Sequence, residues 1–264
     1  MKKYLVIGNP IGHSLSPKLH NYWIKVNNLK AIYEKKKLCE NEIENLILQV
    51  REKKIHGINV TVPFKKAVIP HIDQLSFEAK KTQSVNTVCL IDNKIVGHNT
   101  DIEGFEMGIK HLKSYVKNKK ILILGAGGVV SSIVFALNKM KASEIVISNR
   151  TKKKAENLKK LFKNLKIIEW GDVPEFDMII NATSIGLSRD DKINLDFSKV
   201  GKNKLFYDVI YNPIETNFLK IGKKLGNQIE NGKLMFVYQA LAAFNLWHEI
   251  QPKINNEVIK LLDK

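Results

Sequence analysis

The sequence predicts an α/β protein made of two α/β domains. Short apolar runs alternate with helical patterns along the 264 residues, and a second series of such runs starts at Lys119. Alternation of strand and helix is typical of a parallel sheet covered by helices. A chain of this length fits one large domain or two modest ones. We therefore expect two α/β units, with the helix predicted over 101–116 as the joint between them.

The first half is expected to contain three buried strands, two helices and a hairpin. The strands are predicted at 4–8, 31–38 and 55–62, and the helices at 17–28 and 41–53. Pro63, which cannot donate to a strand ladder, closes the third strand. Asp92 and Asn93 separate two β-rich runs in the segment 84–100, which predicts a β-hairpin. A helix should begin near Asp101.

The second half begins with an apolar strand, a glycine-rich turn and an apolar helix. The turn is "GAGG" at 125–128. Further strands are predicted at 144–150, 177–184 and 204–211, with a lysine-rich helix at 151–163 and mostly helical structure from 216 onward.

The composition indicates a globular protein. The chain is 44% hydrophobic and 8% aromatic, and it has no apolar run of the roughly 20 residues that a membrane helix needs. The N-terminal apolar run is too short for a signal peptide, so that we expect a cytoplasmic protein. Cys39 and Cys89 have no partner motif and are expected to be reduced core residues rather than a disulfide. The histidines show no paired spacing, and no metal site is expected.

The net charge of +17 raises the alternative of a nucleic-acid-binding protein. The lysines are scattered along the whole chain among many Asn and Ile residues, which indicates a general bias on solvated faces. We therefore expect neither a nucleic acid nor a membrane as partner, but an attraction for small anionic ligands. DNA retention that falls steeply with rising salt concentration would favour the alternative.

The turn at 125–128 predicts a dinucleotide site. Glycines let the backbone approach a pyrophosphate, whose charge the amides at a helix N-terminus neutralise. The turn follows a strand and opens a helix, as this site requires, although Val130 stands at the third glycine position. An ordinary tight turn is the alternative.

The next strand favours NADP over NAD. NAD-binding folds usually carry an acidic residue there for the ribose 2′-hydroxyl. Here the strand ends in "SNRTKKK", and Arg150 with the following lysines would suit a 2′-phosphate. A solvated basic helix start is the alternative, but basic residues in a first turn oppose the helix dipole, and an anionic ligand would explain them.

Polar residues at element ends in the first half predict a substrate site. Asn59 and Thr61 lie on the same side of the third strand, and Lys65 follows. Lys65 and Asp101 would make a proton-transfer pair, although Asp101 alone could be a helix cap. Together with "VNT" at 85–87 and "HNTD" at 98–101, these groups suggest a polyhydroxylated, acidic substrate.

The segment "GNPIGHSLSPKLHN" at 8–21 contains two serines, Ser14 and Ser16, that are not needed to form a loop. With it, the chain resembles the shikimate dehydrogenase family from Tyr4 to about Glu249. The resemblance rests on this segment and on "NVTVPFK", "VNT", "GHNTDIEG", "GAGG", "NRT", "NATSIG", "YDVIYNPIET" and "NGKLMFVYQALAAF".

The resemblance implies reversible, NADPH-linked reduction of 3-dehydroshikimate to shikimate, on the route to chorismate and the aromatic amino acids. It implies a substrate domain with a mostly parallel sheet at 1–101 plus 236–264 and a Rossmann-like NADP domain at 102–235. The active site would lie in the cleft between them. The enzyme would be a monomer or a homodimer.

The resemblance also implies roles for individual residues. Ser14 and Ser16 would bind the substrate carboxylate, and Lys65 with Asp101 would be the catalytic pair. The other substrate-binding residues would be Asn59, Thr61, Asn86, Tyr211 and Gln239. The cofactor would be bound by Gly125, Ala126, Gly127, Gly128, Val129, Asn149, Arg150, Thr151, Lys152, Lys154, Thr183, Val209 and Gly232.

Three positions depart from the family pattern. Ser131 stands in place of an arginine after "GAGG", Phe77 in place of a glutamate, and Val209 in place of a methionine. The nearest alternative is a quinate or dual-specificity dehydrogenase of the same superfamily, which often uses NAD. Those enzymes tend to carry an acid shortly after the Asn-Arg pair, where this chain has lysines at 152–154.

Overall fold

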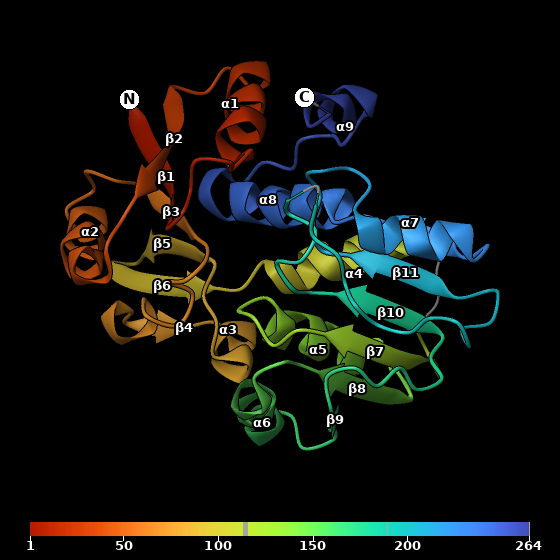
Figure 1. The fold of residues 1–264 in the computed structure, drawn as a ribbon. Coiled ribbons are helices and arrows are strands. Elements are labelled where there is room, and N and C mark those ends of the chain that lie inside the picture. Colours follow the sequence, from red (N-terminus) through yellow and green to blue (C-terminus); the bar gives the residue numbers. More distant parts are fainter. Residues whose placement is uncertain (113–115, 189, 264) are drawn as a thin grey trace. The chain divides into compact units, whose positions relative to one another are not determined.

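The computed structural model describes residues 1–112, 116–188 and 190–263. The chain divides into two compact units, which we call the first unit, Met1–Gly104 with Val237–Lys264, and the second unit, Phe105–Phe236. Each unit has its own sheet with helices beside it (Figure 1). Helix α4, Asp101–His111, lies at the boundary in sequence, and part of the longer helix expected there falls at 113–115, outside the described residues.

The first unit contains a six-stranded sheet in the order β2-β1-β3-β5-β6-β4. Its strands are β1 Lys2–Gly8, β2 Ala31–Lys37, β3 Gly57–Val60, β4 Gln74–Leu75, β5 Thr87–Ile91 and β6 Lys94–His98. β1 runs parallel to β2 and β3, and β4 parallel to β6, whereas β5 is antiparallel to both β3 and β6. The sheet is therefore mostly parallel, as expected. The helices are α1 Ser16–Val26, α2 Ile43–Arg51, α3 Phe77–Thr82 and α9 Asn256–Leu261, together with most of α8 Lys233–His248 and two short 3₁₀ turns, Glu40–Glu42 and Ile69–His71.

The hairpin predicted from Asp92 and Asn93 is confirmed. Ile91 pairs with Lys94, so that these two residues form the whole turn. Their φ angles are +48° and +59°. Two consecutive positive φ angles define the turn that matches the twist of a hairpin, and Asn and Asp tolerate this conformation better than most residues.

Helix α8, near the end of the chain, packs into the first unit through Trp247. Its indole Nε1 donates to the backbone oxygen of Val88 at 3.1 Å. A Cβ on Gly57 would lie 2.3 Å from the same nitrogen, so that β3 needs a glycine at this point. This contact explains how a segment at the end of the chain belongs to the unit formed by its beginning.

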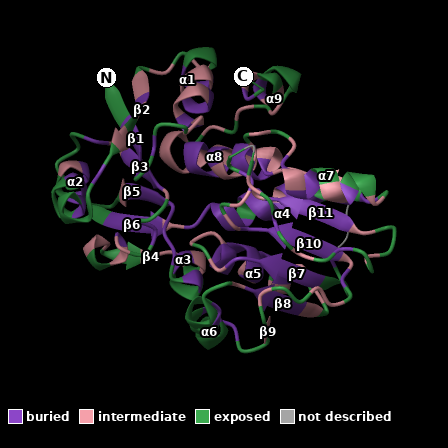
Figure 2. Cartoon of the chain, in the orientation of Figure 1, coloured by how far each residue is buried: buried purple, intermediate pink, exposed green. Residues whose placement is uncertain are grey.

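The second unit contains a parallel sheet in the order β12-β11-β10-β7-β8-β9. Its strands are β7 Lys120–Leu124, β8 Glu144–Ser148, β9 Lys166–Ile168, β10 Met178–Asn181, β11 Leu205–Asp208 and β12 Gln228–Glu230, and its other helices are α5 Val130–Lys139, α6 Lys152–Leu161 and α7 Asn217–Lys224. The chain leaves β7 in one direction for β8 and β9, then returns to its other side for β10. This is the Rossmann order, with its switch point between β7 and β10. The central strands are buried (Figure 2).

The structure corrects several expected elements. The strands predicted at 55–62, 177–184 and 204–211 are shorter, because their polar ends bend into the loops that carry the site residues. The helix predicted at 41–53 is split into a 3₁₀ turn and α2, and the segment after 216 includes the strand β12. Cys89 is buried as expected, whereas Cys39 is exposed, because it lies between β2 and the 3₁₀ turn and not in the core. Strands β4, β9 and β12 are edge strands of two or three residues, too short for a periodic pattern. In the described part of the chain, no helix combines the length and apolarity needed to span a membrane.

Asp208 organises two loops at the carboxyl end of the second sheet. Its carboxylate accepts hydrogen bonds from the Thr216 hydroxyl at 2.6 Å, from the Ile210 amide at 3.0 Å and from the Asn181 side chain at 3.1 Å. Asn181 in turn accepts from the amide and the hydroxyl of Thr183. Asp208 is fully buried, and desolvation raises its pKa from 3.8 to about 6 despite these donors.

Burial of Asp208 should make the free energy of unfolding fall as the pH rises. The folded protein holds this proton more tightly than the unfolded chain, so that stability is lost as the pH increases from about 4 to about 6. A shift of this size corresponds to roughly 2–3 kcal/mol. Urea unfolding of Asp208→Asn at several pH values should show this part of the pH dependence removed. Asp196→Asn, which changes an exposed carboxylate, should leave it in place. Identical pH profiles for wild type and Asp208→Asn would contradict the assignment.

Candidate active site

The first unit brings Lys65 and Asp101 together as a buried ion pair. Lys65 Nζ donates to Asp101 Oδ2 at 2.5 Å, and the exposed fractions of the two residues are 9% and 6%. Lys65 lies in the turn after β3, where its backbone oxygen accepts from the Val85 amide at 2.9 Å. Asp101 is the first residue of α4, where the helix dipole favours a carboxylate. The pairing expected from the sequence is therefore present.

Asn86 binds the other oxygen of Asp101. Its Nδ2 donates to Asp101 Oδ1 and to Thr100 Oγ1, both at 2.9 Å. Its Oδ1 accepts from the Thr100 amide at 2.7 Å. Each Asp101 oxygen thus has a donor, which is what a buried carboxylate requires.

Asn59 is held mainly by the protein. Its Nδ2 donates to the backbone oxygen of Asn86 at 3.1 Å and to Thr87 Oγ1 at 3.0 Å, and its Oδ1 accepts from the Tyr33 hydroxyl at 2.6 Å. Both amide hydrogens are therefore used, and only a second lone pair on Oδ1 remains for a ligand. The nearby Thr61 is half-buried, and its hydroxyl makes no hydrogen bond to the described residues.

Ser14 and Ser16 lie at the start of α1. Ser14 Oγ accepts from the Ser16 amide at 3.3 Å, and the helix has no side-chain cap. Serine hydroxyls beside an uncapped helix N-terminus form an environment that suits a carboxylate. The two serines of the opening segment therefore lie where a carboxylate could bind.

The turn at 125–128 has the shape of a phosphate cradle. Gly125 has φ +106°, and a Cβ there would lie 2.8 Å from the backbone oxygen of Ala182, so that only glycine fits. Gly127 faces open space, where a Cβ would have a single neighbour at 3.8 Å. Helix α5 follows without a side-chain cap and without an acid in its first turn. The turn lies at the carboxyl end of β7, beside the switch point where such folds bind dinucleotides.

The residues after β8 are basic and exposed. Lys152 Nζ pairs with Glu169 Oε1 at 2.5 Å, whereas Arg150 and Lys154 have no ion-pair partner among the residues that the structure describes. The Asn149 side chain closes the turn by donating to the backbone oxygen of Thr151 at 2.8 Å. Arg150 and Lys154 are thus available for an anion, and the ion pair with Glu169 occupies Lys152. The residues of this unit fit NADP.

The remaining expected site residues have mixed surroundings. The Thr183 hydroxyl donates to Asn181 Oδ1 at 2.7 Å and accepts from the Ile185 amide at 3.0 Å, so that it builds its own loop. A Cβ on Gly232 would lie 2.1 Å from the Val209 backbone oxygen, which explains this glycine by packing. Tyr211 stacks on Phe236 with ring centroids 4.5 Å apart. Gln239 is half-buried on α8 in the first unit.

The three departures from the family pattern have different surroundings. Ser131 is buried in the first turn of α5. Phe77 is 64% exposed, with Lys81 Nζ 5.6 Å from its ring centroid. Val209 is half-buried at the end of β11.

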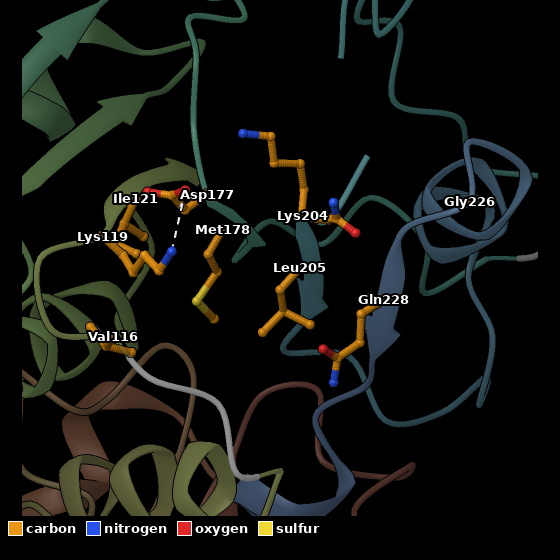
Figure 3. Close-up of a pocket in the computed structure, with 10 residues that line it drawn as sticks. Val116, Lys119, Ile121, Asp177, Met178, Lys204, Leu205, Gly226 and Gln228 are labelled. Atoms are coloured by element: carbon orange, nitrogen blue, oxygen red, sulfur yellow. Dashed lines mark ion pairs between the residues drawn. The ribbon is translucent and has the colours of Figure 1, made fainter. Parts of the chain in front are cut away.

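A hollow of about 360 Å³ in the second unit lies away from these residues (Figure 3). Lys119, Met178, Leu205 and Gln228 line it, and all four stand at the amino ends of strands. Ligands of such sheets bind at the carboxyl ends, and we therefore do not assign this hollow to the cofactor. Among the described residues, no group of three His, Cys, Asp or Glu side chains could hold a metal ion.

Sequence reasoning missed several residues that build the site. Tyr33, Asn181 and Asp208 fall within predicted buried strands, and the sequence analysis gave them no role in the site. A tyrosine or an aspartate in a buried strand usually needs a hydrogen-bond partner. This requirement could have indicated that these residues belong to a polar network.

Two family models match the chain. One describes the shikimate dehydrogenase substrate-binding domain and matches residues 6–88, and the other describes shikimate/quinate 5-dehydrogenase and matches residues 108–211.

Similar proteins support the same family. The chain is 60% identical to a shikimate dehydrogenase (NADP⁺) of Pelagibacter ubique, over 99% of both chains. A solved shikimate dehydrogenase in complex with NADP⁺ is 33% identical, with a TM-score of 0.92 over 100% of this chain and 94% of that one. The enzyme of Thermus thermophilus in complex with NADP(H) and shikimate is 30% identical, with a TM-score of 0.90 over 99% of this chain and 98% of that one. The chain belongs to the shikimate dehydrogenase family.

Proposed function

We propose that the chain catalyses the reversible, NADPH-linked reduction of 3-dehydroshikimate to shikimate, a step of the pathway to chorismate and the aromatic amino acids. The observation that carries the proposal is the buried pair of Lys65 and Asp101 in a chain 60% identical to an NADP-dependent shikimate dehydrogenase. A buried lysine and carboxylate beside several amide and hydroxyl groups suit proton transfer to a hydroxylated substrate.

All but one of the substrate groups in this proposal belong to the first unit, and Tyr211 belongs to the second. Ser14, Ser16 and the start of α1 bind the carboxylate. Thr61, Asn86, Asp101, Tyr211 and Gln239 bind ring hydroxyls or the carboxylate, and Asn59 contributes at most its one remaining lone pair. The unbonded Thr61 hydroxyl and the half-buried Ser14 support these assignments.

Lys65 and Asp101 have separate tasks. When bound, NADP would supply the hydride acceptor for oxidation of the carbinol carbon and, as NADPH, the hydride donor for reduction. During reduction the Lys65 ammonium gives a proton to the substrate oxygen, and during oxidation the neutral Lys65 amine takes that proton from the substrate hydroxyl. Asp101 holds the lysine in place through its 2.5 Å contact and accepts a hydrogen bond from a substrate hydroxyl.

The second unit binds the cofactor. The backbone of Gly125, Ala126, Gly127, Gly128 and Val129 faces the pyrophosphate. Arg150 and Lys154 hold the 2′-phosphate, with Asn149, Thr151 and Lys152 shaping the turn. Thr183, Val209 and Gly232 border the nicotinamide side. We further propose a cytoplasmic protein, in keeping with its two free cysteines, that is a monomer or a homodimer.

A spectrophotometric assay tests the proposed reaction. Purified protein is supplied with shikimate or quinate, each with NADP or with NAD, and the formation of reduced nucleotide is followed. We expect shikimate with NADP to give the highest kcat/KM. Absence of any reduction with shikimate and NADP would contradict the proposal. A preference for quinate with NAD would assign the chain to the other branch of the superfamily.

Replacing Arg150 should change the affinity for NADP selectively. A charge-assisted hydrogen bond contributes about 1.5–3 kcal/mol. Arg150→Ala should therefore raise the Kd of NADP by roughly 10- to 100-fold and leave that of NAD nearly unchanged. Lys159→Ala removes a cation from the exposed end of α6 and serves as the control. Equal losses for NADP and NAD, measured by fluorescence titration, would show that Arg150 does not bind the 2′-phosphate.

Replacing Lys65 should affect turnover more than binding. Loss of a proton-transfer group lowers kcat, whereas loss of uniform binding raises KM. Lys65→Met should lower kcat by roughly 100-fold or more with a modest change in the KM of shikimate. Lys66→Met, at the exposed neighbouring position, is the matched control. If Lys65→Met keeps a normal kcat and only KM rises, Lys65 is a binding residue and proton transfer belongs elsewhere.

A further inference from the structure

A chain of buried hydrogen bonds joins Tyr33 to the Lys65–Asp101 pair. The Tyr33 hydroxyl contacts Asn59 at 2.6 Å, and Asn59 contacts Thr87 Oγ1 at 3.0 Å. Thr87 Oγ1 contacts Asn86 Oδ1 at 3.1 Å, and Asn86 contacts Asp101 at 2.9 Å. All of these residues belong to the first unit. The five residues from Tyr33 to Asp101 each have an exposed fraction of 6% or less, and that of Lys65 is 9%.

The hydrogen bonds in this series all point the same way, with each donor on the Tyr33 side and each acceptor on the Asp101 side. Asp101 and the backbone oxygen of Asn86 can only accept, so that Asn86 and Asn59 must turn their amino groups toward them. The Asn59 oxygen is then left facing Tyr33, whose hydroxyl must donate to it. The Thr87 hydroxyl accepts a hydrogen bond from the Asn59 amino group and donates one to Asn86 Oδ1.

Tyr33 is well placed to remain a donor. It lies on β2 with an exposed fraction of 1%, and desolvation raises its pKa well above the usual value, so that the phenol keeps its proton. His20 stacks on its ring at a centroid distance of 4.1 Å with an interplanar angle of 4°. This parallel contact fixes the plane of the ring and therefore the direction of the hydroxyl.

We propose that Tyr33 is a positioning residue of the active site, which acts through Asn59 on Asn86 and Asp101. Asn59 binds both the backbone and, through Thr87, the side chain of Asn86, so that its own position determines where Asn86 meets Asp101. Without the Tyr33 hydroxyl, the Asn59 oxygen has lost its 2.6 Å donor inside the protein. A buried acceptor without a donor is unfavourable, so that Asn59 is expected to shift toward another donor. The inference rests on the proposed reaction.

The variant Tyr33→Phe tests the proposal because it removes the hydroxyl and keeps the ring. We expect kcat/KM for shikimate to fall by roughly tenfold, equivalent to about 1.4 kcal/mol, with the Kd of NADP within about twofold of wild type. Isothermal titration calorimetry of shikimate without NADP should show weaker binding.

Tyr4→Phe is the matched control. Tyr4 lies opposite Tyr33 on the neighbouring strand β1 and has the same 1% exposed fraction. Its hydroxyl makes no hydrogen bond to any residue that the structure describes. Tyr4→Phe should leave kcat/KM for shikimate unchanged, and thermal unfolding of both variants shows whether either loses its fold.

A double-mutant cycle with Asn59→Ala identifies the route of the effect. If Tyr33 acts through Asn59, adding Tyr33→Phe to Asn59→Ala changes kcat/KM for shikimate by less than about twofold. An undiminished tenfold effect in that background would overturn the route, and Ser16, which also interacts with the Tyr33 phenol, would replace Asn59 in it.

The possible failures are distinguishable. An inactive wild type contradicts the proposed reaction, whereas an active wild type with a normal Tyr33→Phe variant overturns only the role of Tyr33. If Tyr33→Phe does not fold, Thr87→Val, which removes the hydroxyl that links Asn59 to Asn86, must lower kcat/KM for shikimate without changing the Kd of NADP, or the positioning role is wrong.

Discussion

The ion pair of Lys65 and Asp101 determines much of the polar interior of the first unit. A charge removed from water is tolerated only when its hydrogen-bonding capacity is satisfied, and breaking such a pair costs several kcal/mol. Lys65 and Asn86 each occupy one oxygen of Asp101, and Asn86 must itself be held by Thr100, Thr87 and the segment around Asn59. The buried amides and hydroxyls of the unit are therefore explained as a solvation shell that the protein supplies in place of water. Such a shell is already formed when a substrate arrives, so that binding does not require these groups to reorganise.

The elements predicted most reliably from the sequence are those with a strong local signal. Three elements show this: the apolar run of β7, the glycine turn after it and the Asp92-Asn93 hairpin. In each, a few consecutive residues are enough to indicate the local structure. The short edge strands β4, β9 and β12 have no such pattern, because two or three residues cannot show a period and their strand conformation comes from the neighbouring strand. The assignment of α8 to the first unit depends on the contact of Trp247 with Gly57 and Val88, which are far away in the sequence. Only the family resemblance indicated it.

The candidate site was predictable where chemistry and position agree, and less so where tertiary packing decides. Lys65 follows β3 and Asp101 follows β6, and the sequence indicated them as a pair through their chemistry and through the family resemblance. The sequence did not reveal that Asn59 has both amide hydrogens bonded within the protein or that Lys152 pairs with Glu169, because both facts depend on partners brought close by folding. Tyr33 was missed for the same reason: in "AIYEKKKL" it is one more strand residue, and only the fold places its hydroxyl against Asn59.

The central proposal is that Asp101 accepts hydrogen bonds from Lys65 on one oxygen and from Asn86 on the other, and also accepts one from a bound substrate hydroxyl. Steady-state kinetics of Asp101→Asn tests it most directly, because the substitution keeps the shape of the side chain and replaces one acceptor by a donor. The new amino group must face either the Lys65 ammonium or the Asn86 amide, both of which also donate. The account predicts that kcat falls and that the KM of shikimate rises in the same variant, while the Kd of NADP is unchanged. A variant with normal kcat and normal KM would contradict it, and a change in KM alone would reduce Asp101 to a substrate-binding residue.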